Sequence, residues 1–156
     1  MIAAALVARL EGQLDALATI LDGATPAALE ARPAPGEWSA RENLAHLARH
    51  HAVFLERLES MLREDRPRLG RYRAEDDPEW PAWIGLPVDE IVARLRATRG
   101  RVIERLRGLS AADAWRTGRH PVLGEVDVPR FVEFMLLHEA HHLYVVMIAL
   151  GLARRG

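Results

Sequence analysis

Residues 39–64 read SARENLAHLARHHAVFLERLESMLRE, and this stretch decides the class of fold. Ser39 and Glu42 form a capping box, in which each side chain can bind an unpaired amide of the first helical turn. Apolar residues then recur at spacings of three and four, along one side of a helix: Leu44, Leu47, Phe54, Leu58 and Met61. The stretch therefore predicts an amphipathic helix that ends before Arg66-Pro67.

Three further segments have the same helical periodicity, at about residues 2–21, 88–107 and 127–151. A short turn of helix can also follow Pro26, in the proline-rich connection before Trp38. No segment alternates apolar and polar residues for long enough to predict a strand. We therefore expect an all-α protein, a four-helix bundle that forms one domain over residues 1–156.

The link between the second and third predicted helices, residues 65–87, is long and has no periodicity. Short loops suffice where consecutive helices are antiparallel neighbours. A link of this length in a compact domain favours a crossover between two helices that are not antiparallel neighbours.

Composition excludes several classes of site and partner. Cysteine is absent, which excludes disulfides, thiolate metal ligands and a cysteine nucleophile. All 21 basic residues are arginine, which excludes Schiff-base lysine chemistry and a phosphate-loop lysine. The net charge of −1 gives no general attraction to nucleic acid or anionic membrane, and the apolar run 143–153 is shorter than the roughly 20 residues of a spanning helix. We therefore expect a cytoplasmic protein that acts on a small molecule, with no nucleic-acid or membrane partner.

Six of the seven histidines lie in the second and fourth predicted helices. His138 and His142 are four residues apart, so a helix presents both imidazoles on one side, and helical projection turns both toward the core. A buried imidazole without a partner costs roughly 1–3 kcal/mol. A shared metal ion would satisfy both histidines, and the alternative is hydrogen bonding to carboxylates or carbonyls of a facing helix.

The second helix offers three candidates for a third ligand: His46, His50 and His51. Periodicity favours His51, which projects nearer the centre of the apolar stripe, whereas His46 lies on its flank. Three protein ligands with an open position are typical of a catalytic zinc site rather than of a closed structural one.

Residues 138–142 read HEAHH and match the zinc-protease string H-E-x-x-H, in which the glutamate is the general base. Zinc proteases take a third ligand from further along the chain, and the 14 residues after His142 contain no His, Asp or Glu, which disfavours a protease. Glu139 is a candidate catalytic base or ligand-orienting group, and the alternative is a solvated glutamate on the helix surface.

Four short segments in order form a larger pattern: GEWS at 36–39, ENLAHL at 42–47, HPVLG at 120–124 and HEAHH at 138–142. In these segments the chain resembles the DinB-like, or YfiT-like, superfamily of bacterial four-helix proteins. Each segment is modest alone, but together they span nearly the whole chain. The resemblance implies an up-down-down-up bundle, in agreement with the long link.

The resemblance also implies a nickel or zinc site whose ligands are His46, His138 and His142, although periodicity favours His51. His50 and His51 then become catalytic candidates that could orient a ligand or accept a proton. Implied activities are thiol S-transfer with a low-molecular-weight thiol, thiol-dependent isomerisation and metal-dependent hydrolysis, and a homodimer is expected. The chain departs from many members after the last ligand, where Leu143-Tyr144 stands near the place of a polar His or Gln.

Three functions remain open at this point. One is a metal-dependent enzyme for small molecules, of thiol S-transferase or hydrolase type. The second is a non-catalytic bundle that the metal stabilises or that senses a ligand, and the third is a metal-free bundle with hydrogen-bonded core histidines. The arginines of the third helix, or those between Arg63 and Arg73, could bind the carboxylates of an anionic thiol, whereas a solvated helix face is the simpler interpretation.

Overall fold

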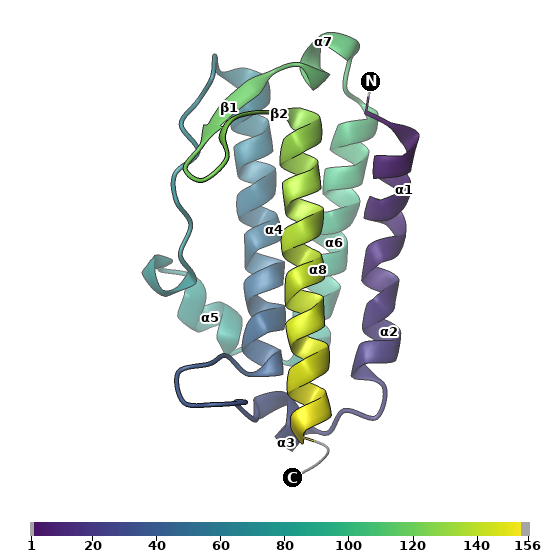
Figure 1. Ribbon diagram of the computed structural model, residues 1–156, viewed down its shortest axis with the longest axis vertical. Helices are drawn as coiled ribbons and strands as arrows, with labels where there is room; N and C mark the ends of the chain where they lie inside the picture. Colours follow the sequence, from purple (N-terminus) through teal and green to yellow (C-terminus); the bar gives the residue numbers. More distant parts are fainter. Residues whose placement is uncertain (1, 154–156) are drawn as a thin grey trace.

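Four long helical segments build the molecule, of which the computed structural model describes residues 2–153 (Figure 1). In Figure 1, the second and third of these segments run in the same direction, and the first and fourth run in the opposite one. The prediction of an all-α, up-down-down-up bundle is thereby confirmed. The segments are α1 (Ala4–Gly12) continued by a 3-10 turn η1 (Gln13–Asp15) and α2 (Ala16–Leu21), then α4 (Ala40–Arg63), α6 (Val88–Arg107) and α8 (Val128–Ala153).

The helices begin where the sequence supplies caps. The Ser39 hydroxyl accepts from the Glu42 amide at 3.2 Å, and the Glu42 carboxylate accepts from the Ser39 amide at 2.7 Å, which confirms the capping box of α4. Asp127 caps α8 by accepting from the Arg130 amide at 2.9 Å. The short helix α3 (Pro26–Glu30) begins at the predicted proline.

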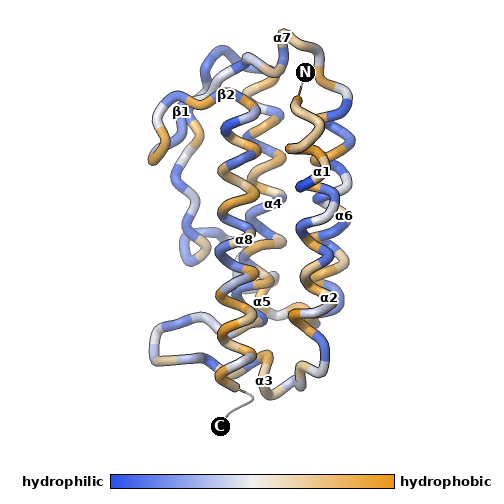
Figure 2. Tube along the Cα trace, turned by 45° about the vertical axis from the view of Figure 1, so that its right-hand side comes forward, coloured by the Kyte–Doolittle hydropathy of each residue, from blue (hydrophilic) through white to orange (hydrophobic). Residues whose placement is uncertain are grey.

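The link between α4 and α6 is a crossover, as predicted. It contains a 3-10 turn η2 (Ala74–Asp76) and the short helix α5 (Trp80–Ile84), and it descends along the outside of α4 (Figure 1). Figure 2 shows that the part before α5 is mostly hydrophilic. The Arg49 guanidinium of α4 holds the crossover by donating to the Asp77 carboxylate at 2.7 Å.

A β-hairpin and a short helix α7 (Ala111–Ala114) connect α6 to α8, so the prediction of no strand was wrong for this segment. The strands β1 (Thr117–His120) and β2 (Gly124–Asp127) are antiparallel. Four residues are too few to display an alternating pattern, and the crossover backbone supports the hairpin through hydrogen bonds between Arg119 and Pro67–Leu69. Gly118 is required here because a Cβ would lie 2.9 Å from the Met61 side chain.

The apolar core has two halves with a polar layer between them. One half contains Leu10, Phe54 and Met135, and the other contains Leu14, Leu47 and Leu143. Each of the four helical segments contributes one residue to the polar layer between these halves: Gln13, His51, Arg99 and Glu139. This layer lies at the level where the candidate site is found.

Helix α8 has one apolar side that no other described element covers. By length and composition the whole helix could cross a membrane, although the uninterrupted apolar run 143–153 alone is too short to do so. However, 39% of its most apolar window is buried inside the bundle, and it packs against α4 and the α1–α2 segment. Its exposed large apolar residues are Leu137, Tyr144, Met147, Ile148 and Leu152.

Candidate metal centre

Three histidines from two helices converge at mid-bundle. His46 from α4 and His138 and His142 from α8 each place a ring nitrogen within 4.8 Å of the other two. The Nε2 atoms of His46 and His138 are 3.2 Å apart. Two metal–nitrogen bonds of about 2.0–2.1 Å at a tetrahedral angle hold their nitrogens roughly 3.3 Å apart. The spacing of this pair therefore fits two ligands of one zinc-like cation.

Asn43 fixes the orientation of the third histidine. Its amide nitrogen donates to the Ser39 carbonyl at 2.9 Å, which turns the amide oxygen toward His142. That oxygen lies 2.9 Å from His142 Nδ1, and because an amide oxygen only accepts, Nδ1 must carry the proton. His142 Nε2 is therefore left with a lone pair, which is the form that binds a metal.

The cluster is neutral at physiological pH. Burial, followed by the charges of neighbouring histidines, lowers the pKa of His46 to about 3, that of His138 to about 4 and that of His142 to about 2. A metal competes with protons for the same lone pairs, so neutral imidazoles are ready to bind it.

The donor set fits a divalent transition metal. Nδ1 of His46 and Nδ1 of His138 are buried and have no hydrogen-bond partner, so neither ring has an acceptor at Nδ1 as His142 does. A cation between the two Nε2 atoms would engage both lone pairs. Imidazole nitrogens without a carboxylate suit zinc or nickel better than magnesium or calcium.

Glu139 and His51 lie in the buried polar layer rather than in the histidine cluster. The Glu139 carboxylate is fully buried; Oε2 accepts from Arg99 and lies 2.9 Å from His51 Nε2, and Oε1 accepts from Gln13 at 2.8 Å. His51 Nδ1 donates to the Leu47 carbonyl at 2.7 Å. Burial opposes the charge of Glu139, but the His51 hydrogen bond and the Arg99 charge hold its pKa below the usual value.

Two sequence expectations are corrected by this arrangement. Glu139 is not a solvated surface glutamate, because it lies at the centre of the buried stripe of α8. His138 and His142 were expected to face the core, but they are half-buried on the flank of that stripe. Periodicity correctly placed His51 in the core and His46 on a flank, and the flank is where the cluster forms. The catalytic roles of Glu139 and His51 stay predictions.

His50 lies beside the cluster. Its ring centroid is 4.1 Å from that of His138, and its buried Nδ1 has no partner. Burial first, and neighbouring positive charges second, lower the pKa of His50 well below its ordinary value. A neutral imidazole with a free nitrogen could accept a proton from a reacting group, so this predicted role stays open. A cavity of about 180 Å³ opens beside His46, His50 and His138.

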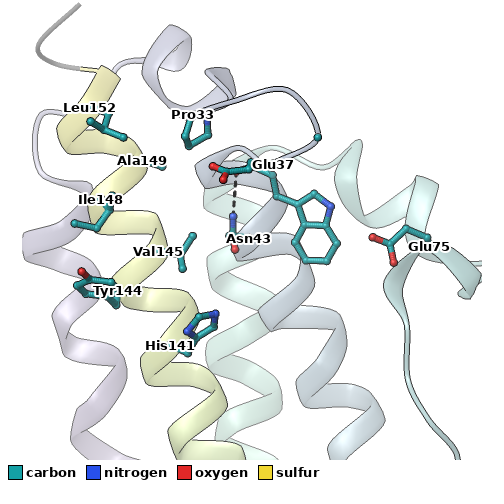
Figure 3. A pocket seen from close by; sticks show the side chains of 12 residues that line it. Pro33, Glu37, Asn43, Glu75, His141, Tyr144, Val145, Ile148, Ala149 and Leu152 are labelled. Atoms are coloured by element: carbon teal, nitrogen blue, oxygen red, sulfur yellow. Dashed lines mark hydrogen bonds between the residues drawn. The ribbon is translucent and has the colours of Figure 1, made fainter.

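A larger hollow of about 530 Å³ lies between the C-terminal half of α8 and the loop before α4 (Figure 3). His141 and Asn43 line it, together with an apolar wall that includes Tyr144 and Ile148. The three clustered histidines do not line this hollow. Asn43 therefore stands between the hollow and the cluster, and His141 belongs to the hollow.

Sequence reasoning missed the residues that support the cluster. Asn43 lies three residues before His46, a spacing that places both on one side of α4 and could have indicated it. Trp38 packs against His46, with ring centroids 5.0 Å apart, which explains its place just before the helix. Arg99 gave no such signal, because it is one of several similarly spaced arginines in α6.

Known proteins resemble the chain in both sequence and fold. A protein of Oceanobacillus iheyensis named "Putative metal-dependent hydrolase" is 30% identical over 110 residues, which are 69% of this chain and 62% of that protein. A Bacillus mycoides protein with the same description is 28% identical over 107 residues, 69% of this chain and 61% of that protein. The chain thus spans less than two thirds of the length of these relatives.

Two solved structures share the architecture. YfiT from Bacillus subtilis, described as a probable metal-dependent hydrolase with an unusual four-helix bundle topology, superposes with a TM-score of 0.79. It is 21% identical, and the match covers 96% of this chain and 85% of YfiT. The four-helix bundle protein TT2238 gives a TM-score of 0.64 at 25% identity, covering 90% of this chain and 94% of that one. Residues 9–146 also match the sequence profile of the DinB superfamily, and the chain belongs to that superfamily.

Proposed function

We propose that the protein is a metal-dependent enzyme for small molecules, of hydrolase or thiol S-transferase type, with one zinc or nickel ion held by His46, His138 and His142. The observation that carries this is the convergence of three neutral imidazoles, one of them oriented by Asn43. The names of the relatives support a metal-dependent hydrolase.

Bound there, the metal would act as a Lewis acid that lowers the pKa of a bound water or thiol. The chain's own residues hold and orient this centre. Asn43 keeps the His142 proton on Nδ1. Trp38, just before α4, packs against the His46 ring. His50 supplies a neutral ring nitrogen at the cavity. The polar layer, with Glu139 at its centre, fixes α8 against α4 and so sets the distance between the ligands.

A second candidate is a non-catalytic bundle in which the same metal only stabilises the fold. The cavity that His46 and His138 line favours the enzyme, since a purely structural site needs no adjoining space for a substrate. Three protein ligands would also leave one position of a four-coordinate cation open, whereas a structural site is normally closed by four protein ligands.

The test compares metal-loaded and chelator-treated protein for two reactions: hydrolysis of nitrophenyl esters and transfer of small thiols to chlorodinitrobenzene. The His46→Gln variant should lose metal and turnover together. The matched control is His141→Gln, because His141 is exposed beside His142 but lies outside the cluster. Stoichiometric metal and a lowered Tm on chelation, without turnover in either reaction, would favour the structural alternative.

A further inference from the structure

The charged side chains that line the cavity beside the histidine cluster are all positive. Two arginines, Arg57 and Arg71, line it, and its lining contains no Asp or Glu. His46, His50 and His138 in the wall are neutral, as described above, and burial lowers the pKa of His120. All charged groups of the cavity are therefore cationic, which complements a ligand with a negative charge.

Arg57 is the better placed of the two arginines. It is half-buried on α4, and one guanidinium nitrogen donates to the Gly70 carbonyl of the crossover, which holds the side chain at the cavity. Burial lowers the pKa of Arg57, and its charge in turn lowers the pKa values of His50 and His120 in the same wall. The half-buried guanidinium thus lies at the wall of the cavity, where its charge reaches the histidines.

Arg57 has no carboxylate partner among the described residues. Its neighbour Glu56 is exposed and lies 3.6 Å from the Arg49 guanidinium instead. The charge of Glu56 reaches Arg57 but does not contact it, and a half-buried cation that no carboxylate contacts leaves room for an anionic ligand to pair with it. The planar guanidinium has further N–H donors, which match the two oxygens of a carboxylate.

The remaining wall is apolar and the space is small. Tyr72 and Phe134 contribute aromatic rings, and Pro121 and Val122 come from the β-hairpin turn. A volume of about 180 Å³ is below the roughly 300–1,000 Å³ of pockets for drug-sized ligands. The cavity therefore suits a short apolar or aromatic body.

We infer that the substrate is a small organic anion whose carboxylate binds Arg57, with Arg71 nearby, and whose apolar body lies between Phe134 and the histidine cluster. This inference rests on the proposed function for the location of the reaction. It assigns Arg57 a role in substrate specificity, because Arg57 would select anionic substrates and the three metal ligands alone would not.

Binding of benzoate, with neutral benzamide as the paired probe, tests the inference by calorimetry on both metal-free and zinc-loaded protein. Benzoate should bind more tightly than benzamide, and Arg57→Gln should weaken benzoate at least about tenfold. Arg71→Gln should weaken it less, and Arg57→Lys should restore part of the loss. The matched control Arg68→Gln, an exposed arginine of the same crossover, should leave benzoate binding unchanged.

Equal affinity for benzoate and benzamide, or benzoate binding that survives Arg57→Gln and Arg71→Gln together, would overturn the inference. Benzoate binding that requires zinc but not the arginines would also overturn it. Each of these results leaves the metal site intact, so the proposed function would stand. Conversely, protein that takes up neither zinc nor nickel but binds benzoate through Arg57 would refute the proposed function and support the anion site.

Discussion

Replacing Glu139 by Gln should destabilise the metal-free protein by about 3–5 kcal/mol, the usual cost of removing one partner from a buried ion pair. The Glu139 carboxylate is fully buried, and Arg99 is only 3% exposed. Without the carboxylate, the Arg99 charge would remain in the core, where its Nε already lacks a partner. Since small domains are stable by only about 5–15 kcal/mol, this loss should be plain in urea unfolding followed by circular dichroism.

The same helix supplies the control. Glu133 pairs with Arg9 at 2.7 Å, but both side chains are more than 40% exposed, so Glu133→Gln should cost about 0–1 kcal/mol. Removing the buried charge as well, in Glu139→Gln with Arg99→Met, should recover much of the stability. If Glu139→Gln costs less than about 1 kcal/mol, or if the double variant is no better than the single one, the polar layer does not hold the bundle as argued.

Three further predictions concern the site and the surface. Asn43→Leu should weaken zinc binding by about 10–100-fold, because His142 would lose the acceptor that fixes its tautomer, and an unchanged Kd in a competitive chelator titration would contradict this. The three clustered histidines should also make the stability of the metal-free protein depend on pH. Below pH 6.5 they bind protons in the unfolded chain, but in the folded protein His46, His138 and His142 stay neutral because their pKa values are lowered, so the free energy of unfolding should fall by about 2 kcal/mol per histidine between pH 6.5 and 5. A urea unfolding midpoint that does not decrease over this pH range would contradict the prediction. The exposed apolar side of α8 should mediate the expected homodimer. Ile148→Glu should therefore shift the mass measured by sedimentation equilibrium toward that of the monomer. A wild-type protein that is monomeric at all concentrations would refute this prediction.

Helix positions could be predicted because their signals are local. The capping box at Ser39 and the cap at Asp127 each act within one turn of the chain, and the structure has both. The β-hairpin could not be predicted in the same way. Its strands are four residues long, and what holds them is the distant backbone at Pro67–Leu69, a contact that no local pattern reveals.

The candidate site shows the same limit. The spacing of His138 and His142 indicates a pair on one side of a helix, but the rotation of that helix within the bundle depends on all its neighbours. The structure rotates α8 so that Glu139 faces the centre and the two histidines face the flank. The charge of Arg99 on another helix makes a buried Glu139 tolerable, and no pattern within α8 contains that information.

His46 and His138 are separated by 92 positions, although their nitrogens nearly touch. A cation joining them would tie a loop that includes the crossover, α6 and the hairpin, and closing a long loop restricts the unfolded chain most. A growing chain on the ribosome could not complete the set of three nitrogens until α8, which carries His138 and His142, had emerged and docked on α4. Loading would then follow the docking of α8 on α4, and loss of the ion would loosen these two helices from one another.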